Sequence, residues 1–280
     1  MILEAFFIFG VKILRVQGDN MNSVQVLISC MYQNMNILNE SNLFHDVVVI
    51  NQCNCSDEKI YQFNDNIQWV NSPERGLSRS RNRAIALSSS DICIISDDDE
   101  LFVDDVHTKV ATVYAEHQDA DLIIFDIKNH NNKLKQQLHY LSIIELFHVS
   151  SVCITFKRNS ILRKGIIFDI NMGSGTGNGG GEEVDFLLRC YKKGLKILYY
   201  PLAIASLKES KSKWFSGYDE KFFYQRGTST RHMLGLPLSI LYAFYYAYSH
   251  KHLYEKNISI WKALRQMLNG IIDNKIKSNL

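Results

Sequence analysis

Residues Ser90–Asp105, with the sequence SDICIISDDDELFVDD, decide the fold that we predict for this 280-residue chain. The apolar run Ile92–Ile95 predicts a short buried strand, and three aspartates, Asp97, Asp98 and Asp99, follow it directly. Alternation along an extended chain is expected to point Asp97 and Asp99 to one side and Asp98 to the other. Two carboxylates about 4 Å apart repel by about 4 kcal/mol at an effective dielectric near 20, so the group needs a compensating charge. A divalent cation at the strand end would supply it, and a solvated acidic turn or a helix-capping cluster is the alternative.

Strands and helices are predicted to alternate around this stretch. The predicted strands are Val24–Ser29, Asp46–Asn51, Ile67–Val70, Asp121–Ile127, Val152–Phe156 and Lys196–Tyr200, the last ended by Pro201, and the predicted helices span residues 32–44 and 77–88. This order is typical of an α/β fold with a mostly parallel sheet that is covered by helices on both faces. Right-handed crossovers then place the carboxyl ends of the first strands along one edge, where a nucleotide is expected to bind.

A basic segment leads into the helix predicted at residues 77–88. The nine residues Arg75–Arg83 (RGLSRSRNR) include four arginines and no acid. Backbone amides at a helix N-terminus and guanidinium groups both suit a diphosphate, and Arg81 is the favoured contact. Two alternatives stay open, a solvated basic face and an ion pair of Arg81 with the aspartates. The patch is small and lacks interleaved aromatic residues, which argues against nucleic-acid binding.

A glycine-rich run precedes a further predicted helix. Gly173–Gly181 contains six of the 15 glycines, and apolar residues then recur at helical spacing from Val184 to Tyr191. Glu182 and Glu183 fall in the first turn, where the helix dipole favours carboxylates. A flexible linker followed by a capped helix would explain both features. The functional interpretation is a mobile loop that closes over a substrate and presents a carboxylate as a general base.

Composition is that of an ordinary globular chain, with 46% hydrophobic residues, 21% charged residues and a net charge of +2. This balance gives no global signature of polyanion binding. The six cysteines show no paired CxxC spacing, and Cys53 and Cys55 form a single CxC, which is a weak zinc signal without a second pair. We therefore expect free thiols in a reducing compartment.

The ordered set of motifs resembles the family 2 glycosyltransferases with a GT-A fold. The resemblance runs from about Val24 to Pro201, through VLIS, VVVIN, ERGLSRSRN, IISDDDE and GGEEVDFLLRCYKKGLKILYYP. It implies a GT-A-like, Rossmann-type, mostly parallel sheet flanked by helices. It also implies an inverting, metal-dependent enzyme that moves a sugar from a nucleotide-diphosphate donor, with UDP-sugars favoured, to the hydroxyl of a glycan or lipid-linked acceptor. The implied cofactor is Mg²⁺ or Mn²⁺, and the implied setting is bacterial surface-polysaccharide synthesis.

The resemblance also assigns expected roles to individual residues. The donor-binding residues would be Ser29, Asn51 and Gln52 at the nucleoside, Arg81 and Asn82 beside the diphosphate, and Asp98 near the ribose or sugar. Asp97 and Asp99 match the metal-binding ends of the family's DxD motif.

Two features of the catalytic half depart from the family pattern. Glu183 matches the second acid of a Glu-Asp pair, which serves as base in inverting members, but the pair here is Glu-Glu, so Glu182 remains the alternative. Many relatives carry a metal-binding histidine shortly after the proline of the last strand, whereas Pro201–Ser210 (PLAIASLKES) contains none. The third metal ligand therefore stays open.

We expect three parts in the chain: an N-terminal extension at 1–20, a GT-A catalytic domain at 21–210 and a C-terminal helical region at 211–280. Met21 precedes the first clear strand, so translation is expected to begin at or near it, with a short membrane-surface anchor as the alternative. The aromatic run Met233–Ser249, interrupted by Pro237 and followed by a basic tail, is typical of membrane-surface binding. Packing on the catalytic domain or a homodimer interface is the alternative. The expected location is the cytoplasm, peripheral on the inner membrane surface.

Two other functions stay open. Sugar nucleotidyltransferases place a glycine-rich phosphate loop after the first strand, and the sequence SCMYQ at residues 29–33 has no glycine. A non-catalytic nucleotide-sugar-binding assembly protein is the other alternative, against which the intact Asp97–Asp99 and Glu183 argue.

Overall fold

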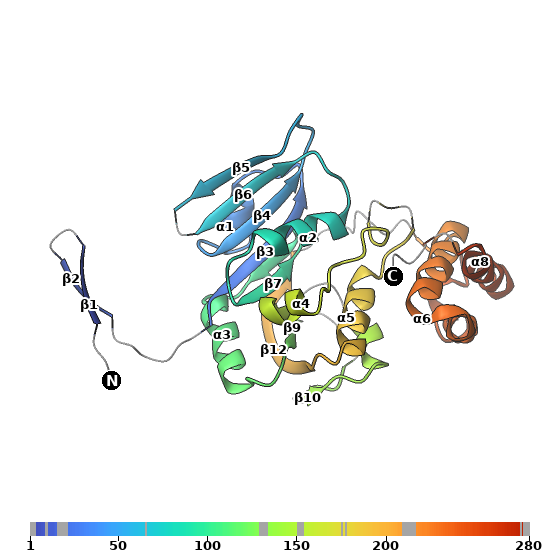
Figure 1. Cartoon of the computed structure of the whole chain (residues 1–280). Coiled ribbons are helices and arrows are strands. Elements are labelled where there is room, and N and C mark those ends of the chain that lie inside the picture. Colours follow the sequence, from blue (N-terminus) through green and yellow to red (C-terminus); the bar gives the residue numbers. More distant parts are fainter. Residues whose placement is uncertain are drawn as a thin grey trace.

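The structure is a computed structural model, and its described residues are 4–8, 11–15, 22–64, 66–128, 134–149, 154–174, 176, 178–208, 217–274 and 276. Within them one mixed sheet of ten strands forms the centre of the molecule, and a separate antiparallel pair, β1 (Glu4–Ile8) and β2 (Val11–Arg15), lies outside that sheet (Figure 1).

The first half of the sheet is parallel, as the sequence predicted. Its strands are β3 (Val24–Met31), β4 (Val47–Gln52), β6 (Ile67–Ser72) and β7 (Ile92–Ser96), in the order β7-β3-β4-β6. All six residues of β4 and all five of β7 are buried, which explains their continuous apolar runs. An antiparallel strand with five exposed residues, β5 (Lys59–Phe63), covers the β6 edge.

The second half of the sheet is mixed. β11 (Ile154–Lys157) runs antiparallel between β7 and β9 (Leu122–Lys128), and β12 (Ile197–Leu207) is parallel to β9. The short strands β8 (Glu100–Phe102) and β10 (His139–Tyr140) pair antiparallel with β12.

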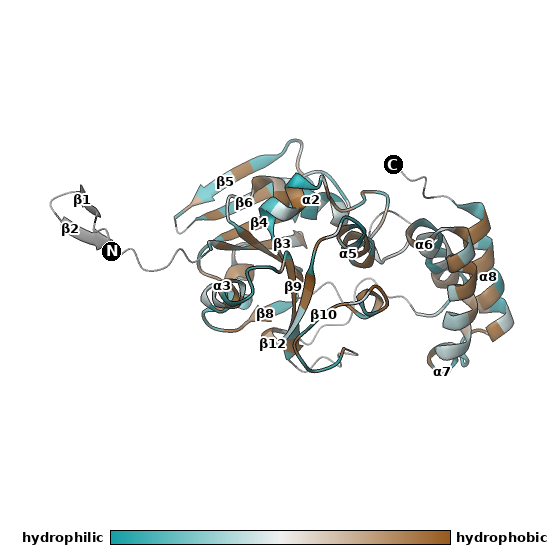
Figure 2. Cartoon of the chain, turned by 60° about the horizontal axis from the view of Figure 1, so that its bottom comes forward, coloured by the Kyte–Doolittle hydropathy of each residue, from teal (hydrophilic) through white to brown (hydrophobic). Residues whose placement is uncertain are grey.

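Helices cover both faces of this sheet, each over its own hydrophobic core. One core lies under α2 (Leu77–Leu87), α4 (Arg158–Arg163), α5 (Glu182–Lys192) and the 3₁₀ turn η1 (Glu145–His148). The other lies under α1 (Asn36–Glu40) and α3 (Val106–Glu116). Figure 2 shows hydrophobic colouring on the inner strands β3 and β9 and also on helices such as α5. The predicted α/β class with helices on both faces is therefore confirmed.

Two boundaries differ from the sequence prediction. The helix expected at residues 32–44 is only the five residues of α1. The strand expected to end at Pro201 continues to Leu207, so that prediction was wrong. The pairing of β12 with β9 shifts register between Tyr199 and Ala203. Pro201 lies within this shift, so its missing N–H interrupts no regular series of hydrogen bonds between the strands. Of the strand predicted at 152–156, residues 152 and 153 lie outside the described chain.

The C-terminal region is helical, as expected, and folds back on itself. α6 (Glu220–Ser249) is broken at Gly235, whose φ of 73° lies in the left-handed region that glycine tolerates. The second half then packs against the first in a small core with α7 (Lys251–Tyr254) and α8 (Ile260–Asp273). Among the described residues, no helix has the length and apolar content needed to cross a membrane.

Glycines at the contact of α6 with α8 give the first testable prediction. A Cβ atom at Gly227 would overlap the backbone carbonyl of Met267, so Gly227→Ala must separate the two helices. Overpacking of this kind costs about 1–3 kcal/mol, and we expect an equivalent loss in the free energy of unfolding, measured by urea denaturation. Asn269→Ala, at an exposed position of α8, is the control. An unchanged midpoint for Gly227→Ala would contradict the close packing.

Candidate active site

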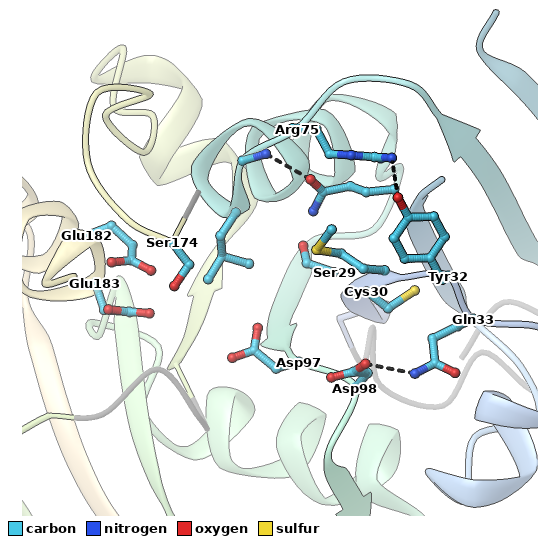
Figure 3. Close-up of a pocket in the computed structure, with 14 residues that line it drawn as sticks. Ser29, Cys30, Tyr32, Gln33, Arg75, Asp97, Asp98, Ser174, Glu182 and Glu183 are labelled. Atoms are coloured by element: carbon cyan, nitrogen blue, oxygen red, sulfur yellow. Dashed lines mark hydrogen bonds between the residues drawn. The ribbon is translucent and has the colours of Figure 1, made fainter. Parts of the chain in front are cut away.

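A cavity of about 620 Å³ lies at the carboxyl ends of β3, β4 and β7, the edge at which the sequence placed the nucleotide. The lining residues are Ser29, Cys30, Met31, Tyr32, Gln33, Gln52, Arg75, Gly76, Leu77, Asp97, Asp98, Ser174, Glu182 and Glu183. Figure 3 shows Glu182 and Glu183 on one side of this pocket, Tyr32 and Arg75 on the opposite side, and Asp97 and Asp98 between them.

Arg81 forms a buried charged junction behind the pocket. Its side chain has no exposed surface, and its guanidinium contacts Asp97 at 3.1 Å, Glu183 at 2.7 Å and Glu182 at 3.7 Å. Burial acts to lower the pKa of Arg81, but the three carboxylates outweigh it and the net shift is upward. The guanidinium therefore keeps its charge.

This geometry bears on the two roles considered for Arg81. Because Arg81 is fully buried and does not line the pocket, the structure favours the ion pair with the acids over direct contact with a diphosphate. The neighbouring Asn82 is likewise bound within the protein, exchanging two hydrogen bonds of 2.8 Å with the backbone of Phe168. The arginine that does line the pocket is Arg75.

The three aspartates lie in a turn rather than in a strand. β7 ends at Ser96, so strand alternation does not extend to them, and the two that line the pocket are Asp97 and Asp98. Asp99 accepts a backbone hydrogen bond from Lys208 at 2.8 Å, and the same lysine donates to the carbonyl of Asp98. Lys208 belongs to the segment after Pro201 in which the sequence showed no histidine.

Burial dominates the acid–base properties of this turn. It raises the pKa of Asp97, although the charge of Arg81 opposes the rise, and it raises the pKa of Glu100 well above its ordinary value. Glu100 is fully buried, accepts a hydrogen bond from the Asp97 backbone at 3.0 Å, and leaves its Oε2 atom without a hydrogen bond among the described residues. Such a surplus of carboxylates fits a site that binds a cation.

Glu182 and Glu183 begin α5 but differ in their surroundings. Glu182 lies beneath the glycine-rich segment, where a Cβ atom on Gly173 would press against its carboxyl group. Burial, followed by the charge of Glu183, raises the pKa of Glu182 to about 8. Glu183 is more exposed, with 14% of its side chain accessible, and carries the short ion pair with Arg81. The two candidates for the base are therefore distinguishable.

The side of the pocket that carries Tyr32 and Arg75 is built by a hydrogen-bond network that the sequence did not reveal. Arg75 donates to the Tyr32 hydroxyl at 2.9 Å and to the side-chain Oδ1 of Asn54 at 2.6 Å, and its guanidinium lies 5.2 Å from the centre of the Tyr32 ring. Tyr32 has a φ of 54° and an exposed side chain. This left-handed backbone conformation is usually adopted by asparagine or glycine. A tyrosine at this position therefore gives no sign in the sequence that the chain turns here.

Of the residues expected at the nucleoside, Ser29 and Gln52 line the pocket, whereas Asn51 lies behind it. The Asn51 side chain bonds the backbone N–H and C=O of Gln33, at 2.9 and 3.1 Å, and so shapes the pocket from below. Gln33 in turn donates to Asp98 at 2.8 Å. Eight lining residues were not selected by the sequence analysis as site residues: Cys30, Met31, Tyr32, Gln33, Arg75, Gly76, Leu77 and Ser174.

The pocket and its acidic turn lie at the carboxyl edge of a parallel sheet, which is where α/β proteins hold their ligands. The sequence model described as glycosyl transferase family 2 matches residues 35–176, half of the chain. The chain therefore belongs to glycosyl transferase family 2. A search of curated protein sequences finds no match.

Solved structures agree on the fold. TarS of S. aureus, residues 1–349, in complex with UDP-GlcNAc superposes with a TM-score of 0.59 and 14% identity, covering 90% of this chain and 80% of that 1–349 chain. A mannosyltransferase from Pyrobaculum calidifontis in complex with GDP-Man and Mn²⁺ gives a TM-score of 0.50 and 13% identity, covering 92% and 76%. At these identities the likeness establishes the fold, GT-A, and the enzyme class is glycosyltransferase by family.

The buried carboxyl of Glu182 predicts a pH-dependent stability. Its folded-state pKa is raised from 4.5 to about 8, so its stabilising contribution is complete below 4.5 and is lost as pH rises through 8. Glu182→Gln keeps the shape of the protonated acid. Near pH 9 we expect its free energy of unfolding, measured by urea denaturation, to exceed that of the wild type by a few kcal/mol, with a smaller difference near pH 6.

Glu116→Gln, at an exposed position of α3, is the matched control and should leave the pH profile unchanged. If Glu182→Gln lowers stability equally at both pH values, the carboxyl is charged in the folded protein and the interpretation is wrong.

Proposed function

We propose that the chain is an inverting, metal-dependent glycosyltransferase that moves a sugar from a nucleotide-diphosphate donor, with UDP-sugars favoured, to an acceptor hydroxyl. The observation that carries this proposal is the pocket that brings Glu183 and the aspartate turn together through Arg81. We assign the catalytic unit to residues 21–210 and the appended helices to 211–280. The complexes of TarS with UDP-GlcNAc and of the mannosyltransferase with GDP-Man support a nucleotide-sugar donor.

The donor would lie with its nucleoside against Tyr32, Gln52 and Arg75 and its diphosphate toward Asp97. An exposed tyrosine ring backed by a guanidinium offers a face on which a base can stack. The side-chain amide of Gln52 is fixed by a 2.8 Å hydrogen bond from the Gly76 backbone N–H to its Oε1. The NH₂ group of the same amide is then left to donate to a base or ribose. Ser29 lines the same wall, where Ser80 donates to its hydroxyl at 3.0 Å.

A divalent cation fits the acidic turn on electrostatic grounds. Arg81 offsets only one of the two charges that Asp97 and Glu183 can carry, and Asp98 and Asp99 add two more beside them. We assign Mg²⁺ or Mn²⁺ to Asp97 and Asp99, with Asp98 toward the ribose or sugar. When bound, the cation would neutralise charge that develops on the departing diphosphate.

Glu183 is the proposed general base, and Glu182 is assigned to supporting the loop. Glu183 has the more accessible carboxyl and lies across the pocket from the nucleoside side (Figure 3). It would accept the proton of the acceptor hydroxyl as that oxygen attacks the sugar from the face opposite the diphosphate. An α-linked donor then gives a β-glycoside. Arg81 would hold the carboxyl in position through its 2.7 Å contact.

Turnover with purified nucleotide sugars tests this proposal. With Mn²⁺ and a UDP-sugar, Glu183→Gln should bind donor as the wild type does but transfer sugar about 10²–10⁴-fold more slowly, because the proton acceptor is lost while the amide oxygen can still accept from Arg81. Asp99→Asn should instead weaken donor binding in the presence of Mn²⁺. Donor affinity is measured by calorimetry and transfer by release of UDP.

Glu182→Gln is the control at the adjacent position and should transfer sugar at a rate close to that of the wild type. If Glu182→Gln abolishes transfer while Glu183→Gln does not, the base is Glu182. If neither UDP-, GDP- nor dTDP-sugars bind, the proposal as a whole is overturned.

The acceptor side of the proposal rests on the C-terminal helices. The second half of α6 exposes apolar side chains along one face, and residues 233–249 include no charged residue. The exposed members are Leu236, Leu238, Leu241, Phe244, Tyr245 and Tyr248. Aromatic side chains of this kind suit a membrane interface, so we propose peripheral contact with the cytoplasmic membrane surface and a lipid-linked acceptor, as in surface-polysaccharide synthesis.

Leu241→Glu should reduce co-sedimentation with vesicles that contain phosphatidylglycerol, because it places a charge in the middle of this apolar face. Asn269→Glu adds the same charge to an exposed position of α8 and should not change sedimentation. Equal sedimentation of both variants and the wild type would remove the membrane proposal without affecting the donor site.

A further inference from the structure

Three ligand-type side chains meet outside the pocket, where α6 packs near α5 and the segment that precedes the glycine-rich run. They are Asp169, Asp185 and His232, and one ligand atom from each lies within 4.8 Å of the other two. None of the three lines the donor pocket. The sequence analysis did not connect them, because they are far apart in the chain.

In each carboxylate of this group, one oxygen is bound by a neighbouring protein group and the other faces the imidazole of His232. Oδ1 of Asp169 accepts a hydrogen bond from the Asn171 backbone at 2.8 Å, and its Oδ2 lies 3.0 Å from His232 Nε2. Oδ2 of Asp185 is bound by Arg189 at 2.6 Å, and its Oδ1 lies 3.9 Å from the same nitrogen. Outer partners orient metal-binding carboxylates in this way.

Burial makes the charge balance of the group important. The exposed fractions of the His232 and Asp185 side chains are only 8% and 6%, and that of Asp169 is 17%. Arg189 offsets one of the two carboxylates, which leaves one negative charge for another cation to balance. His232 Nδ1 has no hydrogen bond among the described residues, so the carboxylates, through Nε2, fix the orientation of the ring.

We propose that Asp169, Asp185 and His232 form a structural binding site for one divalent transition-metal cation, Zn²⁺ or Mn²⁺, separate from the cation proposed at the aspartate turn. One imidazole and two carboxylates form a donor set that such ions accept. With metal–ligand distances of about 2.0–2.2 Å, ligand atoms lie roughly 3–4 Å apart, close to the spacing seen here.

A hydrogen bond from Nε2 of His232 is the alternative to a cation at this position. A single N–H at Nε2 reaches Asp169 at 3.0 Å but cannot serve both carboxylates, because the 3.9 Å from Nε2 to Asp185 Oδ1 is too long for a hydrogen bond. A cation between the three atoms contacts all of them after a small closure. It would also tie the C-terminal helix α6 to α5, the helix that begins with Glu182 and Glu183.

Calorimetric titration of the chelator-stripped full chain with Zn²⁺, without nucleotide, tests the site. We expect one tight equivalent, and Asp169→Asn and His232→Gln should each weaken it at least about 10-fold. His252→Gln, at an exposed histidine of α7, is the matched control. Asp97→Asn/Asp99→Asn and Cys53→Ser/Cys55→Ser should retain the equivalent, because the aspartate turn and the CxC thiols are not the ligands.

Absence of a tight equivalent in the wild type overturns the proposal, as does unchanged affinity in both Asp169→Asn and His232→Gln. Loss of the equivalent in the cysteine variant would assign the zinc to Cys53 and Cys55 instead. The absorption spectrum of the wild-type protein with bound Co²⁺ reports the type of ligand even if the variants do not fold. A thiolate charge-transfer band in the near ultraviolet would contradict a site of one histidine and two carboxylates. Failure of the metal site leaves donor binding untouched, so it is distinguishable from failure of the proposed function.

Discussion

The candidate active site depends on one buried guanidinium. Arg81 lies on α2, and the acids that it contacts come from the end of β7 and the start of α5, about 16 and 102 residues further along the chain. Without a cation between them, Asp97 and Glu183 would repel across a site of low dielectric. Removing one partner of a buried ion pair typically costs about 3–5 kcal/mol, so the position of α2 and the arrangement of the acids depend on each other. The Phe168 ring, 5.4 Å from the guanidinium, completes the surroundings of the charge.

This constraint separates two adjacent glutamates that look equivalent in sequence. Gly173 packs against the Glu182 carboxyl, and burial raises the pKa of that carboxyl, so at neutral pH Glu182 serves as a neutral packing group beneath the loop. The carboxyl of Glu183 reaches the pocket from the next position of the helix. The same glycine-rich segment that looked like a linker is needed because a larger residue at position 173 would displace Glu182. Its glycines provide room for close packing as well as freedom of the backbone.

Much of the fold followed from sequence patterns, and the details of the site did not. Continuous apolar runs such as Val47–Ile50 identify buried parallel strands because both faces of those strands are covered, and the edge that holds the pocket follows from their direction. The exposed strand β5 has no such run, and β12 passes through Pro201 because a register shift removes the need for its N–H. Which arginine of the basic segment reaches the pocket depends on how α2 is rotated against the sheet. Periodicity relates Arg79 to Arg83, but it does not show that Arg75, before the helix, meets Tyr32. The cluster of Asp169, Asp185 and His232 arises only from tertiary packing.

The most direct test of the central claim is a crystal structure of the chain with a UDP-sugar and Mn²⁺, with the metal located by anomalous scattering. The account predicts the nucleoside against Tyr32 and Gln52 and a manganese ion between the diphosphate and the aspartate turn. Arg81 should still contact Asp97 and Glu183. A diphosphate bound directly by Arg81, with Glu183 released from it, would contradict the role assigned to this junction, as would a nucleotide bound outside the pocket.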